Sequence, residues 1–254
     1  MSDTVPALSI RKLAKSFSEI AVLRDINLVV NRGEVVSVLG PSGAGKSTML
    51  RCINWLEEPD HGVIHIGGRR IGIDERTGSR MGKRALAALR ARTGMVFQSF
   101  NLWPHMSVLQ NVMEAPTQVK GVSRDEAREN AIRLLDRVGL AHRRDSFPGV
   151  LSNGQKQRVA IARAIAMKPE IILFDEPTSA LDPEMSGDVL SVMKDLSDEG
   201  HTMIVVTHEM DFARNVSDQV VFLDDGKLIE KSAPDKFFTA PETDRVRRFL
   251  ELNN

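Results

Sequence analysis

The chain has 254 residues, with 34 lysines and arginines balanced by 34 aspartates and glutamates, and 42% of its residues are hydrophobic. This composition excludes a disordered, collagenous or disulfide-rich protein. The zero formal net charge argues against a dedicated nucleic-acid binder, which usually carries a basic excess. No apolar run reaches the roughly 18 residues of a spanning helix, and the first residues lack the apolar core of a signal peptide. The single cysteine, Cys52, forms no intramolecular disulfide and suits a reducing cytoplasm.

The first third of the chain is rich in strand patterns. Short apolar or alternating runs occupy residues 8–13, 22–30, 34–40 and 62–68, and a turn signal at 31–33 separates two of them. These runs predict a mostly antiparallel β region. It leads into a strand from Val35 to Leu39 whose residues are apolar enough for burial within a parallel sheet.

The middle of the chain is helical. Ser123 and Glu126 predict a capping box at the start of a helix that Gly139 ends. The apolar stripe of this helix consists of Ala127, Ala131, Leu134, Leu135 and Val138. A second helix is predicted from Gly154 to Met167. Residues 99–165 are therefore expected to form a helical insertion.

The last third returns to alternating strands and helices. Residues 171–174 and 202–207 are short apolar runs, and between them Asp182 and Pro183 begin a helix that Gly200 closes. This spacing predicts a βαβ unit with parallel strands. Residues 220–231 predict a β-hairpin with Asp225 and Gly226 in its turn.

A phosphate-binding loop lies between the strand at 35–39 and the next predicted helix. Residues 40–47 read GPSGAGKS, which fits the pattern G-x-x-x-x-G-K-[ST]. Its glycines let the backbone curl until N–H groups converge on phosphate oxygens. Lys46 adds a positive charge, Ser47 offers a hydroxyl to Mg²⁺, and the helix N-terminus adds its dipole.

Two further segments carry candidate chemistry. Asp175 and Glu176 follow a buried strand, where one carboxylate can hold Mg²⁺ and the other can deprotonate an attacking water. Ser152 and Gln155 predict a second capping box. Local physics does not decide whether that helix start is only capped or also receives an anion.

Five motifs in one order resemble the nucleotide-binding subunit of ATP-binding cassette (ABC) transporters. They are the loop at 40–47 (Walker A), Gln98 in MVFQ, LSNGQKQR at 151–158, ILFDEPTSALD at 172–182, and Thr207-His208. The resemblance covers nearly the whole chain. It implies an α/β fold: a P-loop NTPase (RecA-like) core with an N-terminal antiparallel β region and an inserted α-helical subdomain. The expected single cassette spans residues 1–254, with 1–98 and 166–254 as the core and 99–165 as the subdomain.

The resemblance assigns roles at the site. Catalytic roles fall to Glu176 as general base, His208 as switch histidine and Gln98 of the Q-loop. Mg²⁺ would be held by Ser47, Gln98 and Asp175 of Walker B. ATP would contact Phe17, Ser42, Gly43, Ala44, Gly45, Lys46, Ser47 and Thr48 of one copy, and Ser152, Gly154, Gln155 and Asp182 of a second copy.

Two departures from the family pattern stand out. The signature is usually LSGGQ, and here Asn153 replaces the first glycine; because Asn tolerates left-handed backbone, the turn is expected to survive. The adenine-stacking residue is often Tyr, which this chain lacks, and Phe17 takes that place.

Residues 101–116 and 237–250 resemble importer ATPases for polar amino acids, a group that also serves opines and other small zwitterionic solutes. The implied function is ATP hydrolysis by a homodimer that drives a separate integral membrane permease, supplied by a solute-binding protein. Trp103 would line the groove for the permease. The implied location is peripheral, at the cytoplasmic face of the cell (inner) membrane. No nucleic-acid partner is expected. One rival is an ABC ATPase acting on DNA or ribosomes. Another is a P-loop kinase or GTPase, which leaves the signature and His208 unexplained.

Overall fold

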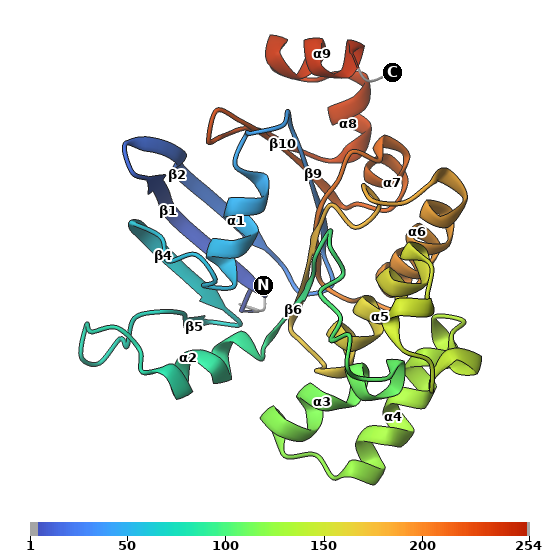
Figure 1. Ribbon diagram of the computed structural model, residues 1–254. Helices are drawn as coiled ribbons and strands as arrows, with labels where there is room; N and C mark the ends of the chain where they lie inside the picture. Colours follow the sequence, from blue (N-terminus) through green and yellow to red (C-terminus); the bar gives the residue numbers. More distant parts are fainter. Residues whose placement is uncertain (1–4, 253–254) are drawn as a thin grey trace.

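The computed structural model describes residues 5–252, so the ends of the expected 1–254 cassette lie outside the described residues. Two β-sheets form the framework (Figure 1). The first has the strand order β2-β1-β4-β5, and every neighbouring pair in it is antiparallel. Its strands are β1 (Leu8–Phe17), β2 (Ile20–Val30), β4 (His61–Ile66) and β5 (Arg69–Arg70). The predicted antiparallel region is confirmed.

The second sheet has the order β10-β9-β3-β8-β7-β6 and is parallel except for the last hairpin. Its strands are β3 (Val35–Leu39), β6 (Thr93–Val96), β7 (Ile171–Asp175), β8 (Met203–Val206), β9 (Gln219–Asp224) and β10 (Lys227–Ser232). Asp225 and Gly226 adopt φ angles of 44° and 73° in the hairpin turn. Positive φ at both central residues is the type I′ geometry expected from the Asp-Gly pair.

The parallel sheet is buried on both faces, which explains why its strands are apolar at successive positions. On one face, Val36 and Val38 share a hydrophobic cluster with α1 (Lys46–Ile53) and the antiparallel sheet. On the other face, Val35 shares a cluster with α5 (Asn153–Ala166) and α6 (Pro183–Asp198). The helix that follows the phosphate-binding loop is thus enclosed between the two sheets (Figure 1).

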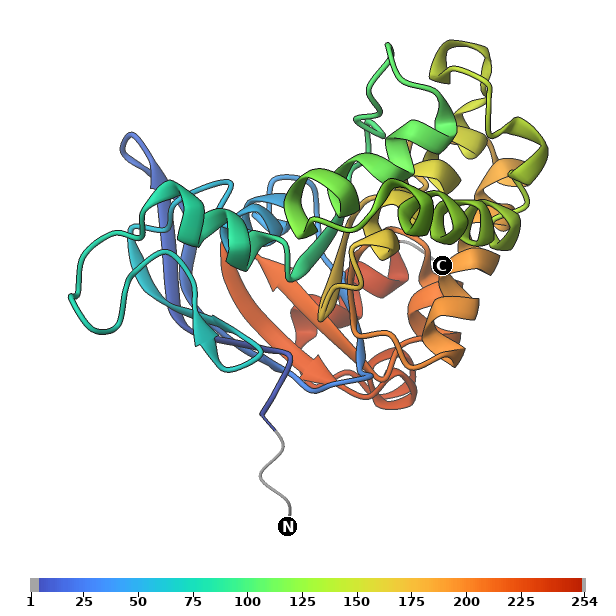
Figure 2. The ribbon, with the colours of Figure 1, turned by 90° about the horizontal axis from the view of Figure 1, so that it is seen from below.

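Three helices lie in the chain between β6 and β7, which are neighbours in the sheet. They are α3 (Val108–Lys120), α4 (Arg124–Arg137) and α5, with 3₁₀ turns at Ala141–Arg143 and Pro148–Val150. Figure 2 shows α3, α4 and α5 gathered to one side of the sheets. The side chain of Ser123 accepts the N–H of Glu126, which is one half of the predicted capping box. Because α5 also packs on the parallel sheet, the boundary of a separate subdomain at 99–165 stays a prediction.

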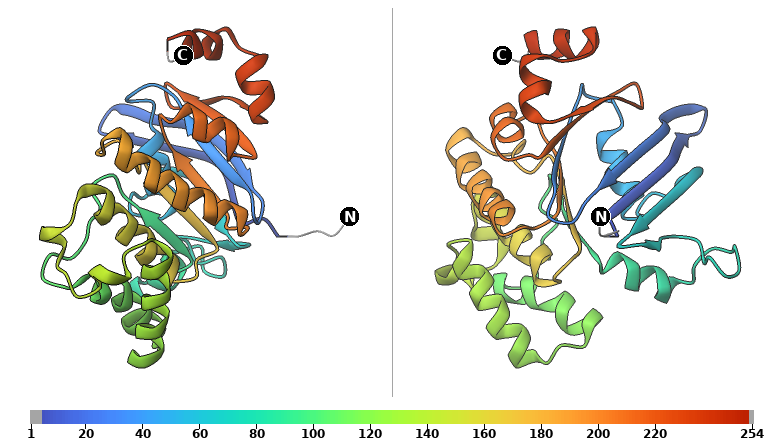
Figure 3. Two further views of the ribbon diagram at one scale, coloured as in Figure 1. Left: turned by 90° about the vertical axis from the view of Figure 1, so that its right-hand side faces the viewer. Right: turned by 180° about the vertical axis from the view of Figure 1, so that it is seen from behind.

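The C-terminal part packs against the outer strands of the parallel sheet. It contains α7 (Met210–Asn215), α8 (Pro234–Thr239) and α9 (Asp244–Glu251), and α8 and α9 lie at the opposite end of the molecule from α3 and α4 (Figure 3). Phe222 of β9 contacts Phe237 and Phe249 in a small aromatic core. Among residues 5–252, no helix combines the length and apolar character needed to cross a membrane.

Candidate nucleotide-binding site

The loop at residues 40–47 has a backbone that only glycine fits at two positions. Gly40 has φ 149°, and a Cβ there would lie 2.0 Å from the carbonyl oxygen of Leu223. Gly45 has φ 99°, and its Cβ would lie 2.8 Å from the carbonyl oxygen of Val22. Both contacts are with backbone, which cannot move aside as a side chain can. The loop therefore curls tightly before α1 begins at Lys46.

A surface cavity of about 360 Å³, the Walker A cavity, opens over this loop. It is lined by Phe17, Val22, Ser42, Gly43, Ala44, Gly45, Lys46, Ser47, Thr48 and Glu176. Phe17 is 43% exposed, and the Lys15 ammonium lies over its ring, 5.0 Å from the ring centre. Sequence reasoning found each of these residues except Val22, whose side chain comes from the neighbouring strand β2. No local pattern marks Val22, since it reads as an ordinary strand residue.

Lys46 is buried although it is charged. Its ammonium donates to the carbonyl oxygens of Gly40 at 2.8 Å and Pro41 at 3.0 Å, both within its own loop. Burial lowers the pKa of the Lys46 ammonium, and the nearby Glu176 and Asp175 carboxylates oppose that shift. The cavity thus combines a desolvated cation with a helix N-terminus, an arrangement that attracts anionic oxygens.

A hydrogen bond joins two residues far apart in sequence, beside the phosphate-binding loop. The hydroxyl of Ser47 donates to Oδ1 of Asp175 over 2.6 Å, across 128 residues of chain. Asp175 is the last residue of β7, and β7 lies two strands from β3, which leads into the loop. A hydroxyl and a carboxylate in contact beside a phosphate-binding loop are oxygen ligands of the kind that Mg²⁺ uses.

Glu176 and His208 form a second pair at the same edge of the sheet. Oε1 of Glu176 lies 3.3 Å from Nε2 of His208. Glu176 holds a positive φ of 48°, uncommon for a residue with a side chain, and its N–H donates to the carbonyl of Val206. This backbone turns the Glu176 side chain into the cavity, away from the direction of Asp175.

Gln98 and Trp103 follow β6. The register pairs Val96 with Phe174, so Gln98 lies near the strand end that carries Asp175, although it is not among the residues that line the cavity. Trp103 is 37% exposed, and its backbone N–H donates to Oδ1 of the fully buried Asn111 over 2.8 Å. The roles of Gln98 and Trp103 stay predictions.

The remaining candidate residues lie in a separate hollow. Ser152, Gly154, Gln155 and Asp182 line a cavity of about 360 Å³ that shares no lining residue with the first. Ser152 and Gln155 exchange both hydrogen bonds of the predicted capping box. Asp182 caps α6 by accepting the N–H of Met185 over 3.0 Å. One chain therefore does not bring the signature to its own Walker A loop.

Asn153 does not use the left-handed backbone that its tolerance suggested. It is the first residue of α5, and its φ is not among the positive values. The prediction that Asn153 is tolerated because it adopts left-handed backbone is therefore wrong. A helical position does not require a residue that tolerates positive φ. Gly154 does have a packing role, since a Cβ on it would lie 3.0 Å from Cβ of Met185 in α6.

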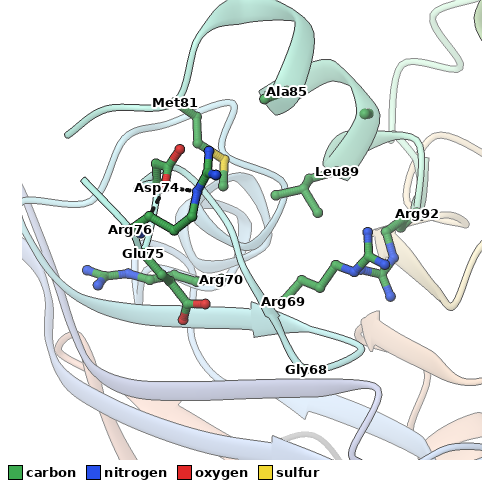
Figure 4. A pocket seen from close by; sticks show the side chains of 11 residues that line it. Gly68, Arg69, Arg70, Asp74, Glu75, Arg76, Met81, Ala85, Leu89 and Arg92 are labelled. Atoms are coloured by element: carbon green, nitrogen blue, oxygen red, sulfur yellow. Dashed lines mark hydrogen bonds and ion pairs between the residues drawn. The ribbon is translucent and has the colours of Figure 1, made fainter. Parts of the chain in front are cut away.

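A larger cavity, of about 440 Å³, lies elsewhere. It opens between α2 (Lys83–Arg90) and the turn into β5, and Figure 4 shows four arginines around it. Arg92 is paired with Glu170, and Arg76 with Asp74 at 3.8 Å. Because the family motifs and the buried Lys46 lie at the phosphate-binding loop, we place the candidate site at the smaller cavity over that loop.

Known proteins share both the sequence and this fold. A sequence model of the ABC transporter family matches residues 23–179. Octopine permease ATP-binding protein P of Rhizobium radiobacter is 52% identical over 248 residues, covering 96% of this chain and 95% of the relative. Histidine/lysine/arginine/ornithine transport ATP-binding protein HisP of Escherichia coli (strain K12) is also 52% identical, covering 96% of each chain. The chain belongs to the ABC transporter ATPase family.

A solved structure supports the same assignment for this ATPase. A dimeric ATP-binding cassette in a post-hydrolysis state, bound to ADP and Pi, has a TM-score of 0.78 at 34% identity. The alignment covers 89% of this chain and 98% of that one. The predicted P-loop NTPase fold and the predicted transport ATPase are therefore confirmed, and a DNA or ribosome ATPase is not favoured.

Proposed function

We propose that two copies of the ATPase close around two ATP molecules, each held between the Walker A cavity of one copy and the signature hollow of the other. The observation that carries this proposal is the separation of the two cavities, which share no lining residue within one chain. A site split in this way becomes complete when a second copy supplies the missing half. A symmetric pair of identical chains then forms two equal sites.

The residues of the Walker A cavity fit a bound Mg²⁺. The Ser47 hydroxyl and the Asp175 carboxylate already lie within 2.6 Å of each other, and Gln98 follows the adjacent strand. When bound there, Mg²⁺ would offset the negative charge of the phosphate oxygens. Ser47 would supply one ligand, and Asp175 and Gln98 would act directly or through water.

Each remaining residue has a task that its position supports. The loop N–H groups and Lys46 hold the phosphates, and Phe17 stacks against the base at the cavity rim. Glu176 accepts the proton of the attacking water, while His208, 3.3 Å from it, orients that carboxylate toward the terminal phosphate. Ser152, Gly154, Gln155 and Asp182 of the second copy exclude solvent from the other side.

We propose that the transported solute is a polar amino acid, an opine or a related small zwitterion. This rests on relatives whose names refer to octopine and to histidine, lysine, arginine and ornithine. The dimer would bind a separate integral membrane permease from the cytoplasmic face, with Trp103 in the docking groove. A solute-binding protein would present the solute to the permease on the other side.

The decisive experiment joins transport to the named base. The ATPase, co-expressed with its permease, should co-purify with the permease chains in detergent and hydrolyse ATP. Glu176→Gln should slow hydrolysis about 10²- to 10⁴-fold, because general base catalysis contributes that factor. The variant should also persist as a dimer with ATP in size-exclusion chromatography. Near-normal hydrolysis by Glu176→Gln would remove the base assignment, and purification without permease would remove the transport proposal.

A further inference from the structure

The residue that departs from the usual signature makes a contact of its own. Asn153 is exposed at the start of α5, and its Nδ2 donates to the carbonyl oxygen of Ala180 over 3.3 Å. Glycine, the more usual residue of the family motif at this position, has no side chain that could donate. The hydrogen bond therefore follows from the substitution itself.

The acceptor lies between two residues of the candidate site, Glu176 and Asp182. The chain turns at Glu176, and both the N–H and the hydroxyl of Ser179 donate to the Glu176 carbonyl, at 3.3 and 3.0 Å. Asp182, which begins α6, ends the segment. The strand-end segment from Glu176 to Asp182 is also held by the hydrogen bond from Glu176 N–H to the Val206 carbonyl and by short-range bonds such as that from Leu181 N–H to the Thr178 carbonyl. Ala180 is where the signature helix reaches it.

Two neighbouring contacts hold α5 against α6 beyond this segment. Gly154 packs against Met185, and Arg158 pairs with Asp188 at 3.3 Å. Both partners lie inside α6, beyond Asp182. The side chain of Asn153 thus adds a hydrogen bond from the signature to the chain leading from the proposed base.

We propose that Asn153 is a positioning residue, which holds the 176–182 segment so that Asp182 and the signature face the second copy as one unit. This inference rests on the proposed two-copy arrangement. Asn153 acts through the Ala180 carbonyl and needs no contact with ATP. Loss of its donor should leave the loop at 40–47 intact, since the hydrogen bond of Asn153 goes to Ala180, which does not line the Walker A cavity.

Hydrogen exchange tests the contact directly and does not depend on activity. In the full-length chain without nucleotide, Asn153→Ala and the isosteric Asn153→Asp should speed amide exchange in residues 178–182 about 2- to 10-fold, the factor for losing one net hydrogen bond. Lys156→Ala, one turn further along α5, is the matched control and should leave this segment unchanged. Unchanged exchange in both Asn153 variants would overturn the proposal.

Kinetics separate positioning from direct contact with nucleotide. Asn153→Ala and Asn153→Gly should lower kcat about 2- to 10-fold, with unchanged affinity of the single chain for a fluorescent ATP analogue and an unchanged Tm. Combined with Asp182→Ala, the loss should be smaller than the product of the single losses, because both act through one segment. Multiplicative losses, or a rate loss that accompanies unchanged exchange, would show that Asn153 acts on the nucleotide directly and would overturn the inference.

Discussion

The two cavities of the site differ in how they are built. The Walker A cavity is formed by one loop, one helix start and residues at the strands of both sheets, and its shape depends on glycines pressed against backbone. The signature hollow is formed where α5 meets α6, and it depends on side-chain packing between two helices. In the proposed arrangement, the first would bind nucleotide within one chain, whereas the second would contribute only when it faces another copy.

This difference has a physical basis. A phosphate-binding loop gathers its N–H donors from consecutive residues, so a short sequence suffices to form it. The signature offers one helix N-terminus and a hydroxyl that is already engaged with Gln155. It therefore adds to a phosphate that the other half holds, and damage to each half should have a distinct result.

The largest effect should come from dividing the two halves between chains. Lys46→Ala and Ser152→Ala should each reduce hydrolysis about 10-fold or more, since each removes a hydrogen bond to charged oxygen. Mixed and re-equilibrated, they should recover up to about a quarter of the wild-type rate, because half of the pairs are mixed and each holds one intact site.

A mixture of wild type with Lys46→Ala is the control for that experiment, because its mixed pairs also contain one intact site. It measures whether a single site turns over. If the control shows that a single site turns over, but the Lys46→Ala and Ser152→Ala mixture recovers no hydrolysis, the split site is contradicted.

The next effect concerns the Walker A cavity alone. Gly45→Ala should weaken binding of a fluorescent ATP analogue to the single chain about tenfold or more, because the residue has φ 99° and its Cβ would lie 2.8 Å from the Val22 carbonyl. Gly187→Ala in α6, where the Cβ would meet nothing within 4 Å, is the matched control. It should leave binding unchanged, and equal binding by both variants would show that the loop shape does not matter.

A smaller effect should follow from changing the signature hollow. Gly154→Ala puts a Cβ 3.0 Å from Cβ of Met185, an atom fixed to the α6 backbone, so the two helices must shift slightly apart at a cost of about 1 kcal/mol. ATP-dependent dimerisation in the Glu176→Gln background should weaken about fivefold, as measured by analytical ultracentrifugation. Binding of the fluorescent analogue by the single chain should not change, and a parallel loss there would contradict the independence of the two cavities.

The smallest effect concerns Cys52, directly behind the loop in α1. Burial raises the pKa of the Cys52 thiol to about 12. Because only the thiolate reacts, and its fraction at pH 8 is on the order of 10⁻⁴, labelling by a thiol reagent should be very slow in the folded chain. The rate should rise with pH and on unfolding. Fast labelling at pH 8 would mean that the region behind the Walker A loop opens readily.

Much of the site was predictable because its motifs are local. The strand at Val35–Leu39, the loop after it and the helix from Asp182 were each expected from consecutive residues, and each is present. Glycine spacing and capping hydrogen bonds act within a few residues, so they remain legible in sequence. The roles of Ser47 and Asp175 at Mg²⁺ were expected from the loop pattern and the strand end, but their 2.6 Å contact could not be read from spacing alone.

The sequence by itself determined the order of the strands and helices and the phosphate-binding loop, since these depend on local backbone preferences and short-range hydrogen bonds. Tertiary structure alone decided that Val22 lines the cavity and that Asn153 is bonded to Ala180. It also decided that the signature lies apart from the Walker A loop of its own chain. These outcomes depend on how sheets and helices pack across long stretches of chain, which no local pattern encodes.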